Sequence, residues 1–403
     1  MPAATPGTPS LLRAMNDRAA LELLLTHGPL SRTRIGHLTG LSKPTASQLL
    51  ARLEAAGLVV ATGTHGGRPG PNAQLYALNA RAAHVAGLDV TPERVLAAVA
   101  DLTGTVTGAF ELPCTEEAGA VGQVTRALDG ALQDAGLGRR DLHRLVIATP
   151  GAFDPRSGRL RYAGHLPGWH SPTLLDELAA ALPMPVEYEN DVNLAAVAEQ
   201  RLGAARGHED FVLLWNEEGL GAALVLGGRL HRGWTGGAGE VGFLPVPGHP
   251  LVRQVTRANS GGYQELAGVQ ALPSLAATAG VRAAAAPDAR PAAQVAAGAE
   301  LLRRAAAEPE GARLRFLRSY ATALATGLAS LVSVLDPEIV VLSGILITAG
   351  GEPLRALLEE ELAELAPSRP RLVTGEVPER PVLRGALECA LATTREDVFD
   401  TSR

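Results

Sequence analysis

Residues 190–193 read Asn-Asp-Val-Asn and stand where an apolar run gives way to an alanine-rich stretch, so we expect a strand-to-helix junction there. Asn190 and Asp191 would then meet the free N–H groups and partial positive charge of a helix N-terminus. Such a junction can hold a hydroxylated ligand while the carboxylate stays ionised. The same residues also form an ordinary helix cap, because Asn and Asp are common at that position. The tetrapeptide alone leaves both interpretations open.

Further segments around this junction share glycine and polar residues. Residues 149–154 read Thr-Pro-Gly-Ala-Phe-Asp, residues 165–169 His-Leu-Pro-Gly-Trp, and residues 236–242 Gly-Gly-Ala-Gly-Glu-Val-Gly. In this order and spacing, from about residue 85 to residue 394, the chain resembles the ROK family of sugar kinases and sugar-responsive repressors. The resemblance implies an α/β fold of two lobes, the actin-like ATPase (ribonuclease H-like) fold. It also implies the sugar-side residues Gly151, His165 (replacing the usual Asn), Asn190, Asp191, Glu240 and Glu265.

The two segments that hold nucleotide phosphates in kinases of this family are altered here. Residues 89–94 read Asp-Val-Thr-Pro-Glu-Arg where the kinases have Asp-x-Gly-Gly-Thr, and the proline lacks an N–H donor. Residues 216–221 read Asn-Glu-Glu-Gly-Leu-Gly in place of Gly-Thr-Gly-x-Gly. A carboxylate touching a triphosphate costs about 1 to 4 kcal/mol. Although Asp191 matches the kinase general base, we expect no kinase activity and no cofactor.

The segment that binds a structural zinc ion in the family lacks its ligands. Phe243 replaces the usual His, and residues 260–265 read Ser-Gly-Gly-Tyr-Gln-Glu without a cysteine. Fewer ligands remain than the four N or S atoms of a structural zinc site. We therefore expect no metal, and a loop held by the packing of Phe243, Leu244, Val246 and Tyr263.

Composition is typical of a globular protein of two or three domains. Of 403 residues, 46% are hydrophobic and 19% are charged. No apolar run approaches the roughly 20 residues of a membrane span, and no cleavable apolar segment begins the chain. We therefore expect a cytoplasmic protein with no membrane partner. Cys114 and Cys389 have no metal-ligand spacing and are expected to be buried thiols.

Charge is distributed unevenly along the chain. Residues 1–80 contain seven basic and three acidic side chains, a net charge of +4. The whole chain has a net charge of −6, so the remainder has −10. A basic arm on an acidic body indicates a polyanion partner for the arm alone.

The arm has the pattern of a winged helix-turn-helix domain within residues 1–80. A first helix is expected at residues 16–26, a second after Ser31 with Ile35 and Leu38 buried, and a third after Ser42. The apolar stripe of the third helix consists of Ala46, Leu49, Leu50 and Leu53. Residues 58–60 and 74–78 predict two strands joined by a glycine-rich wing.

Polar residues off that stripe are candidates for DNA contact. Residues 40–47 and the Gly-Arg-Pro at residues 67–69 resemble the N-terminal domain of ROK repressors. Thr45 and Gln48 are expected at base edges, and Lys43 and Arg52 at phosphates. An arginine on the wing suits a minor groove. The candidate set is Arg32, Lys43, Thr45, Ser47, Gln48, Arg52 and Arg68, each of which is also compatible with an ordinary solvated surface residue.

Two strand meanders organise the remainder. The first is expected at residues 85–90, 94–101 and 105–112, before a helix at 116–135 and a strand at 145–149. The second, at residues 211–216, 219–226 and 229–231, repeats this pattern, as an actin-like fold implies. A helix at 312–335, a strand at 339–342 and a last helix at 383–394 follow. We expect one lobe at 81–200, completed by 383–403, and a second lobe at 201–382.

The leading hypothesis is a transcription regulator, a repressor of carbohydrate-related genes, that binds double-stranded operator DNA as a homodimer or homotetramer. A sugar or sugar phosphate in the cleft would change lobe closure and the spacing of the heads, which read half-sites about 10 bp apart or multiples of this. Two alternatives stay open. One is a sugar kinase with an attached DNA-binding arm, and the other is a regulator whose cleft binds nothing.

Overall fold

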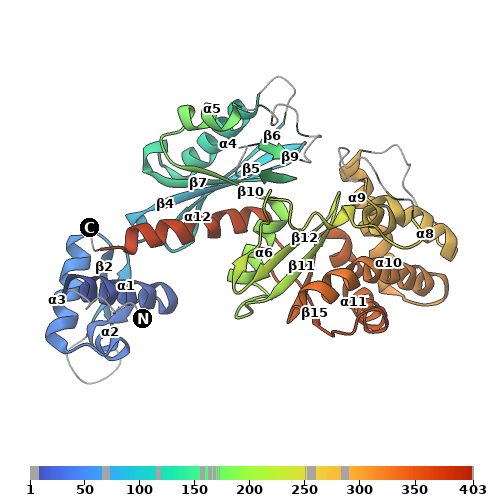
Figure 1. Cartoon of the computed structure of the whole chain (residues 1–403). Coiled ribbons are helices and arrows are strands. Elements are labelled where there is room, and N and C mark those ends of the chain that lie inside the picture. Colours follow the sequence, from blue (N-terminus) through green and yellow to red (C-terminus); the bar gives the residue numbers. More distant parts are fainter. Residues whose placement is uncertain are drawn as a thin grey trace.

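A small head joins a body of two α/β lobes in this protein (Figure 1). The computed structural model describes residues 9–65, 73–114, 119–154, 159–161, 166, 169, 171, 173–249, 251, 260–282 and 290–401. The architecture confirms the predicted winged helix-turn-helix domain followed by two lobes. We propose that the head ends near residue 80 and that the first lobe gives way to the second near residue 200.

Three helices and a small sheet form the head. These are α1 (Pro9–His27), α2 (Arg32–Thr39) and α3 (Lys43–Ala55), with β1 (Leu30–Ser31), β2 (Val59–His65) and β3 (Ala73–Leu78) in the order β1-β3-β2. The predicted caps are confirmed, because Ser31 Oγ accepts a hydrogen bond from Arg34 N and Ser42 Oγ accepts one from Thr45 N. Gly40 makes the turn between α2 and α3 with a φ of 71°, a conformation that glycine adopts without strain.

The apolar stripe of α3 forms the centre of the head. Its four residues are each at most 1% exposed, and Ile35 of α2 is fully buried. Leu38 was expected beside them, but its side chain is 37% exposed and this prediction is wrong. The reason is that α2 approaches α3 through Ile35 and Gly36, so Leu38 lies on another side of this short helix. Helix α1 also begins at Pro9 rather than near residue 16.

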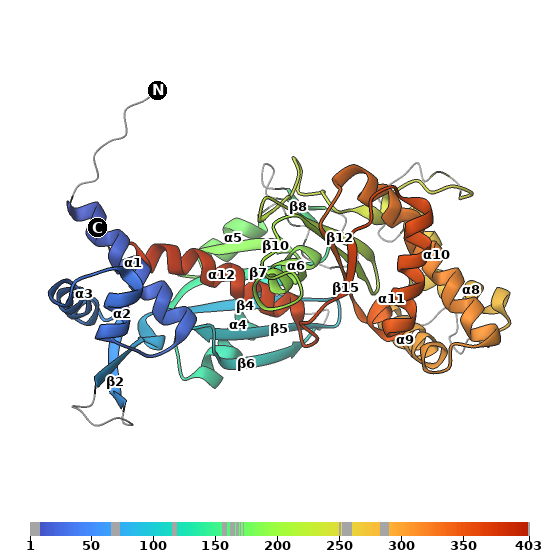
Figure 2. The ribbon, with the colours of Figure 1, turned by 90° about the horizontal axis from the view of Figure 1, so that it is seen from below.

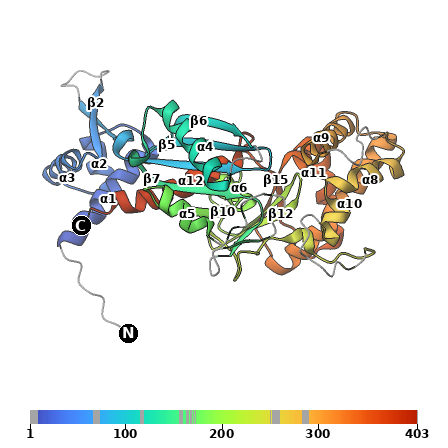
Figure 3. The ribbon, with the colours of Figure 1, turned by 90° about the horizontal axis from the view of Figure 1, so that it is seen from above.

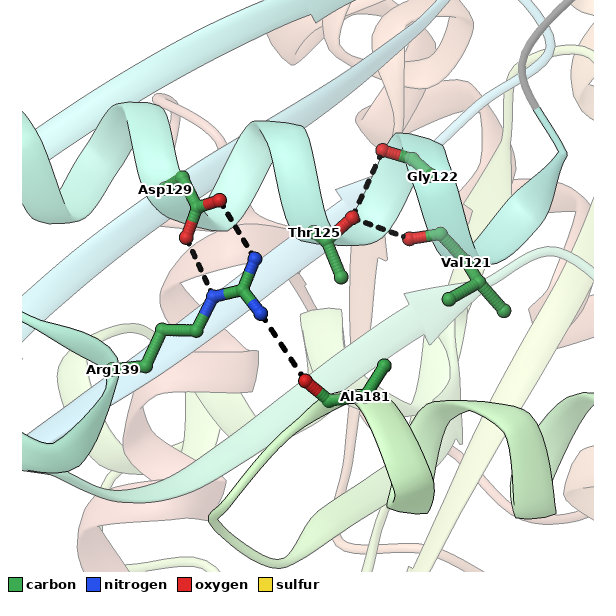
Figure 4. Close-up of polar contacts among 6 residues, drawn as sticks. All are labelled: Val121, Gly122, Thr125, Asp129, Arg139 and Ala181. Carbon is green, nitrogen blue, oxygen red and sulfur yellow. Dashed lines mark hydrogen bonds and ion pairs between the residues drawn. The ribbon is translucent and has the colours of Figure 1, made fainter.

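The first lobe has a five-stranded sheet in the order β10-β7-β4-β5-β6. Its strands are β4 (His84–Val90), β5 (Arg94–Asp101), β6 (Val106–Pro113), β7 (Leu142–Thr149) and β10 (Val186–Asn190), and a short ladder of β8 (Ala152–Asp154) and β9 (Arg159–Arg161) follows β7. Helices α4 (Ala120–Ala135) and α5 (Leu174–Ala181) pack together. Arg139 joins them by donating to both carboxylate oxygens of Asp129 at 2.7 Å and to the Ala181 carbonyl at 3.2 Å (Figure 4).

The second lobe repeats this strand order, as β13-β12-β11-β14-β15. Its strands are β11 (Phe211–Asn216), β12 (Leu220–Leu226), β13 (Arg229–Leu230), β14 (Ile339–Ser343) and β15 (Arg371–Thr374), and its helices are α7 (Gly262–Ala267), α8 (Leu272–Ala279), α9 (Pro291–Ala307), α10 (Gly311–Leu335) and α11 (Ile345–Leu365). Both sheets place their third, second, first, fourth and fifth strands side by side. This shared order is the internal repeat that the two meanders predicted. No helix in the described part of the chain has both the length and the apolar character for crossing a bilayer.

Two helices, α6 (Asp191–Leu202) and α12 (Pro381–Phe399), lie between the two sheets. One apolar cluster unites buried residues of both helices with Val146 of the first lobe and Phe211 of the second. Gly385 of α12 permits this packing, because a Cβ atom there would lie 1.8 Å from the Leu194 carbonyl oxygen of α6. The cluster therefore makes α6 and α12 a shared support for both lobes.

Helix α12 also connects the body to the head. It extends from the region between the lobes to the head, as Figures 1 and 2 show, and Phe399 at its end is 2% exposed within the head core. Just beyond it, Thr401 Oγ1 donates a hydrogen bond of 3.1 Å to Asp17 Oδ2 of α1. The first and last helices of the described chain therefore meet, although the predicted role of the last helix was only to complete the first lobe.

Candidate functional site

Helix α3 presents a polar face to solvent. Lys43, Thr45 and Gln48 are exposed, and α3 lies on the side of the head that is remote from the body in Figures 2 and 3. The Ser42 cap fixes the start of the helix, since its hydroxyl is 3.4 Å from Thr45 N and 2.8 Å from Thr45 Oγ1. This face has the position of a recognition helix in a helix-turn-helix domain.

Two other candidates for DNA contact bind each other. Arg32 Nη1 donates to Ser47 Oγ at 3.1 Å, and Ser47 Oγ donates to the Lys43 carbonyl at 2.9 Å. Arg32 is exposed, whereas Ser47 is half-buried. Ser47 therefore positions Arg32 beside the start of α3. Arg68 lies outside the described residues.

Arg52 was expected at a DNA phosphate, but the structure gives it a partner within the head. Its Nη2 atom lies 2.7 Å from Asp17 Oδ1, and the Asp17 side chain is only 5% exposed. The guanidinium therefore neutralises a buried carboxylate that joins α1, α3 and the end of the chain. Arg52 therefore supports the head, and its contact with a DNA phosphate stays a prediction.

A cavity of about 200 Å³ lies between the lobes. The first lobe contributes Gly151, Asn190 and Asp191, and the second contributes Glu240 and the turn at residues 217–221. The carboxyl end of β7 and the N-terminus of α6 position the first three residues. The cavity walls therefore come from the end of β7 and the start of α6 in the first lobe, and from Glu240 and the turn at residues 217–221 in the second.

The residues at the start of α6 cap the helix and line the cavity at once. Asn190 Oδ1 accepts a hydrogen bond from Asn193 N at 3.0 Å, which is the cap. Its Nδ2 atom donates to the Gly151 carbonyl at 3.0 Å and to Asp191 Oδ1 at 2.9 Å. Asp191 Oδ1 also accepts from Val192 N at 2.8 Å. The cap and the site, left as alternatives by the sequence, are compatible in this geometry.

The structure brings together only part of the predicted sugar-side set. Gly151, Asn190, Asp191 and Glu240 line the cavity, whereas Glu265 is exposed on α7 and does not line it. His165 lies outside the described residues. The neighbour of Glu265, Gln264, lines the cavity instead and is 1% exposed. Sequence reasoning missed this glutamine, since its only signal was its position beside Tyr263, which is fully buried as expected.

Burial governs the electrostatics of the cavity. Desolvation raises the pKa of Asp191 to about 8, and repulsion from Asp89, Glu240 and Glu217 adds to the rise. Burial raises the pKa of Glu217 to about 7 and that of Asp89 to about 6, and it also raises the pKa of Glu240. Burial and mutual repulsion therefore favour the protonated, uncharged forms of these carboxyl groups near neutral pH, and the cavity gains negative charge as the pH rises. Among the described residues, no group of three or more His, Cys, Asp or Glu side chains could hold a metal ion.

Comparisons with known proteins match both parts of the chain. The model of the ROK family matches residues 85–393, and that of the MarR family matches residues 16–68. The DNA-binding transcriptional dual regulator NagC of Escherichia coli is 24% identical over 269 residues, which are 65% of this chain and 64% of that protein. The chain therefore spans less than two thirds of this regulator's length.

Solved structures agree with these matches. A ROK hexokinase from Thermus thermophilus has a TM-score of 0.63 at 30% identity, over 78% of this chain and 99% of the hexokinase. A ROK family transcriptional regulator, a homologue of the E. coli MLC protein, has a TM-score of 0.69 at 20% identity, over 96% of this chain and 99% of its own. The second likeness extends over the head as well as the body.

Proposed function

The chain belongs to the ROK family, and we propose that it is a sequence-specific DNA-binding transcription regulator, acting as a repressor whose body senses a sugar or a sugar phosphate. The observation that carries the proposal is the head. A MarR-type winged helix domain is docked on the body, with Lys43, Thr45 and Gln48 exposed on α3. In helix-turn-helix proteins the second helix of the motif enters the major groove, where amide and hydroxyl side chains read base edges.

Helix α12 supplies a route by which the cleft can influence the head. It packs on α6, whose first residues are Asp191 and the cap Asn190, and it ends in the head core at Phe399. A ligand that binds one state of the lobes more tightly shifts the population towards that state. Movement of α6 against the second lobe then changes the orientation of the head through α12.

The effector and the assembly follow from the same reasoning. Carboxylates in the cleft accept hydrogen bonds, and sugar hydroxyls donate them.

A single head holds DNA weakly and with little specificity, so we propose a homodimer or homotetramer that reads half-sites about 10 bp apart or multiples of this. Its place of action is the cytoplasm.

The test is selection of bound fragments from sheared genomic DNA by the full chain at about 150 mM salt, with and without a mixed sugar pool. The expected result is an enriched palindromic site whose occupancy changes with sugar. Gln48→Ala is expected to abolish the enrichment while leaving thermal stability unchanged, since Gln48 is exposed. Absence of any enriched site would refute the proposed DNA-binding function. Enrichment indifferent to sugar would instead favour a regulator with an empty cleft.

A kinase is the rival that the 30% identity to the hexokinase favours. Against it, Glu217 and Glu218 occupy the turn that approaches the nucleotide in the kinases the chain resembles, and Glu217 Oε1 already accepts a hydrogen bond of 3.1 Å from Ile345 N at the start of α11. Coupled measurement of ADP release across common hexoses discriminates the two. Turnover that is lost in Asp191→Asn would establish the kinase.

A further inference from the structure

The solvent side of α3 is centred on a single glutamine. Residues 44, 48, 51 and 55 follow one another at intervals of four, three and four, so they share one face of the helix. All four are exposed, and they lie opposite the buried apolar stripe of α3. We call this set the reading face; it consists of Pro44, Gln48, Ala51 and Ala55.

Gln48 is the member of the reading face whose side chain can form hydrogen bonds. The side chains of Pro44, Ala51 and Ala55 end in carbon atoms and contain neither a donor nor an acceptor. Because these side chains are also small, they allow the helix to approach the floor of a groove closely. The reading face is therefore one amide group surrounded by small apolar groups.

The polar residues on either side of the reading face are held within the head. Thr45 Oγ1 lies 2.8 Å from the hydroxyl that caps the helix, and Ser47 Oγ donates to the Lys43 carbonyl at 2.9 Å. Arg52 Nη2 lies 2.7 Å from a buried carboxylate of α1. A contact of Thr45, Ser47 or Arg52 with a base would compete with these bonds. Selection of a base therefore falls mainly to Gln48.

The chemistry of the reading face matches A·T base pairs. In the major groove, adenine presents the N7 acceptor and the N6 donor, and a glutamine amide can bond to both at once. Thymine presents a C5-methyl group, which packs against small apolar side chains such as that of alanine. Guanine presents two acceptors instead, and these suit an arginine or a lysine better than an amide.

We propose that Gln48 selects an adenine in each half-site of the operator, and that Pro44 and Ala51 contact the methyl groups of thymines beside it. The inference rests on the proposed DNA-binding function and names the base pairs that the head reads. Helix-turn-helix proteins contact base edges through the N-terminal residues of the recognition helix, and Gln48 lies in the first half of α3.

The experiment is selection of bound duplexes from a random-sequence library by the full chain at about 150 mM salt, with the wild type and with Gln48→Arg. Arginine bonds to O6 and N7 of guanine, so one position of each half-site should change from A·T to G·C while the others keep their preference. Gln133→Arg makes the same change on the exposed side of α4 in the body, and is expected to leave the selected site unchanged.

Base analogues in the selected duplex test the individual contacts, with binding followed by fluorescence anisotropy. At the position that changed, 7-deazaadenine removes the N7 acceptor and is expected to weaken binding of the wild type about fivefold. Gln48→Ala has already lost that bond and should show no further weakening. Deoxyuridine in place of the neighbouring thymidine removes only the methyl group, and is expected to weaken wild-type binding about threefold.

Two results would overturn the inference while the DNA-binding function stands. One is a selected site in which Gln48→Arg changes no position, or changes one that was not A·T in the wild type. The other is an equal loss from 7-deazaadenine in the wild type and in Gln48→Ala. If neither protein enriches any sequence, the proposed DNA-binding function itself fails, and the inference fails with it.

Discussion

Replacement of Arg52 by alanine separates two roles for this residue, phosphate contact and support of the head. Its Nη2 atom lies 2.7 Å from Asp17 Oδ1; the two side chains are 41% and 5% exposed. Breaking a fully buried ion pair costs about 3–5 kcal/mol, and breaking an exposed one costs about 0.2–1 kcal/mol. Since only Asp17 is buried, and Thr401 still donates to it, we expect a loss of about 2 kcal/mol in the free energy of unfolding of the head.

Urea denaturation and amide hydrogen exchange of α1 and α3 measure this loss in the full chain. Arg18→Ala is the matched control, because Arg18 and Glu22 form an exposed pair on α1, with side chains 49% and 54% exposed. We expect that control to cost about 0.5 kcal/mol or less. The Arg52→Ala cost should nearly vanish in an Asp17→Asn background, since the asparagine leaves no buried charge to neutralise.

DNA binding supplies the second half of the test. Binding to a random duplex is followed by fluorescence anisotropy at several salt concentrations. The slope of the logarithm of the binding constant against the logarithm of the salt concentration becomes smaller by about 0.9 for each phosphate contact removed. Lys43→Ala is expected to show that fall, because Lys43 is exposed on α3. Arg52→Ala is expected to keep the wild-type slope. A normal stability together with a reduced slope for Arg52→Ala would refute this reasoning and restore Arg52 as a phosphate contact.

Three further predictions concern the body. Burial raises the pKa of Asp191 to about 8, so the folded state keeps a proton that the unfolded chain loses above about pH 4, and stability falls as pH rises towards 8. Asp191→Asn removes this pH dependence, so its free energy of unfolding, measured by urea denaturation, should rise relative to that of the wild type by up to about 1.4 kcal/mol per pH unit. A difference between the two proteins that does not change with pH would contradict this prediction. Glu199→Gln should cost about 2–4 kcal/mol, because the buried Glu199 carboxylate accepts from three backbone N–H groups, and an unchanged thermal midpoint would exclude this. Gly385→Ala should separate α12 from α6 at a cost of more than about 3 kcal/mol, since the new Cβ would meet Leu194, whereas Gly122→Ala in α4 meets nothing within 4 Å and should be neutral or stabilising.

Local chemistry made much of the fold predictable. The caps at Ser31 and Ser42 and the turn at Gly40 depend on contacts within a few residues, and they are present as the pattern predicted. The repeated meander was visible because strand periodicity and turn residues recur in both halves of the sequence. The acids at residues 217 and 218 could likewise be recognised in the phosphate turn before any geometry was known.

What each polar side chain bonds to was decided by the tertiary structure. Arg52 and Asp17 are 35 residues apart, and Glu217 and the N–H group of Ile345 are 128 apart. These pairs exist because the fold brings α1 to α3 and the turn after β11 to the start of α11. The exposure of Leu38 was fixed in the same way, by the side on which α2 meets α3. Sequence periodicity gives the faces of an element, but the choice between two plausible faces or partners depends on the competing surfaces that folding brings together. For that reason the sequence determined the family and the altered phosphate loops, and the structure alone showed that Arg52 pairs with Asp17, that Gln264 lines the cleft and that α12 extends from the lobes into the head.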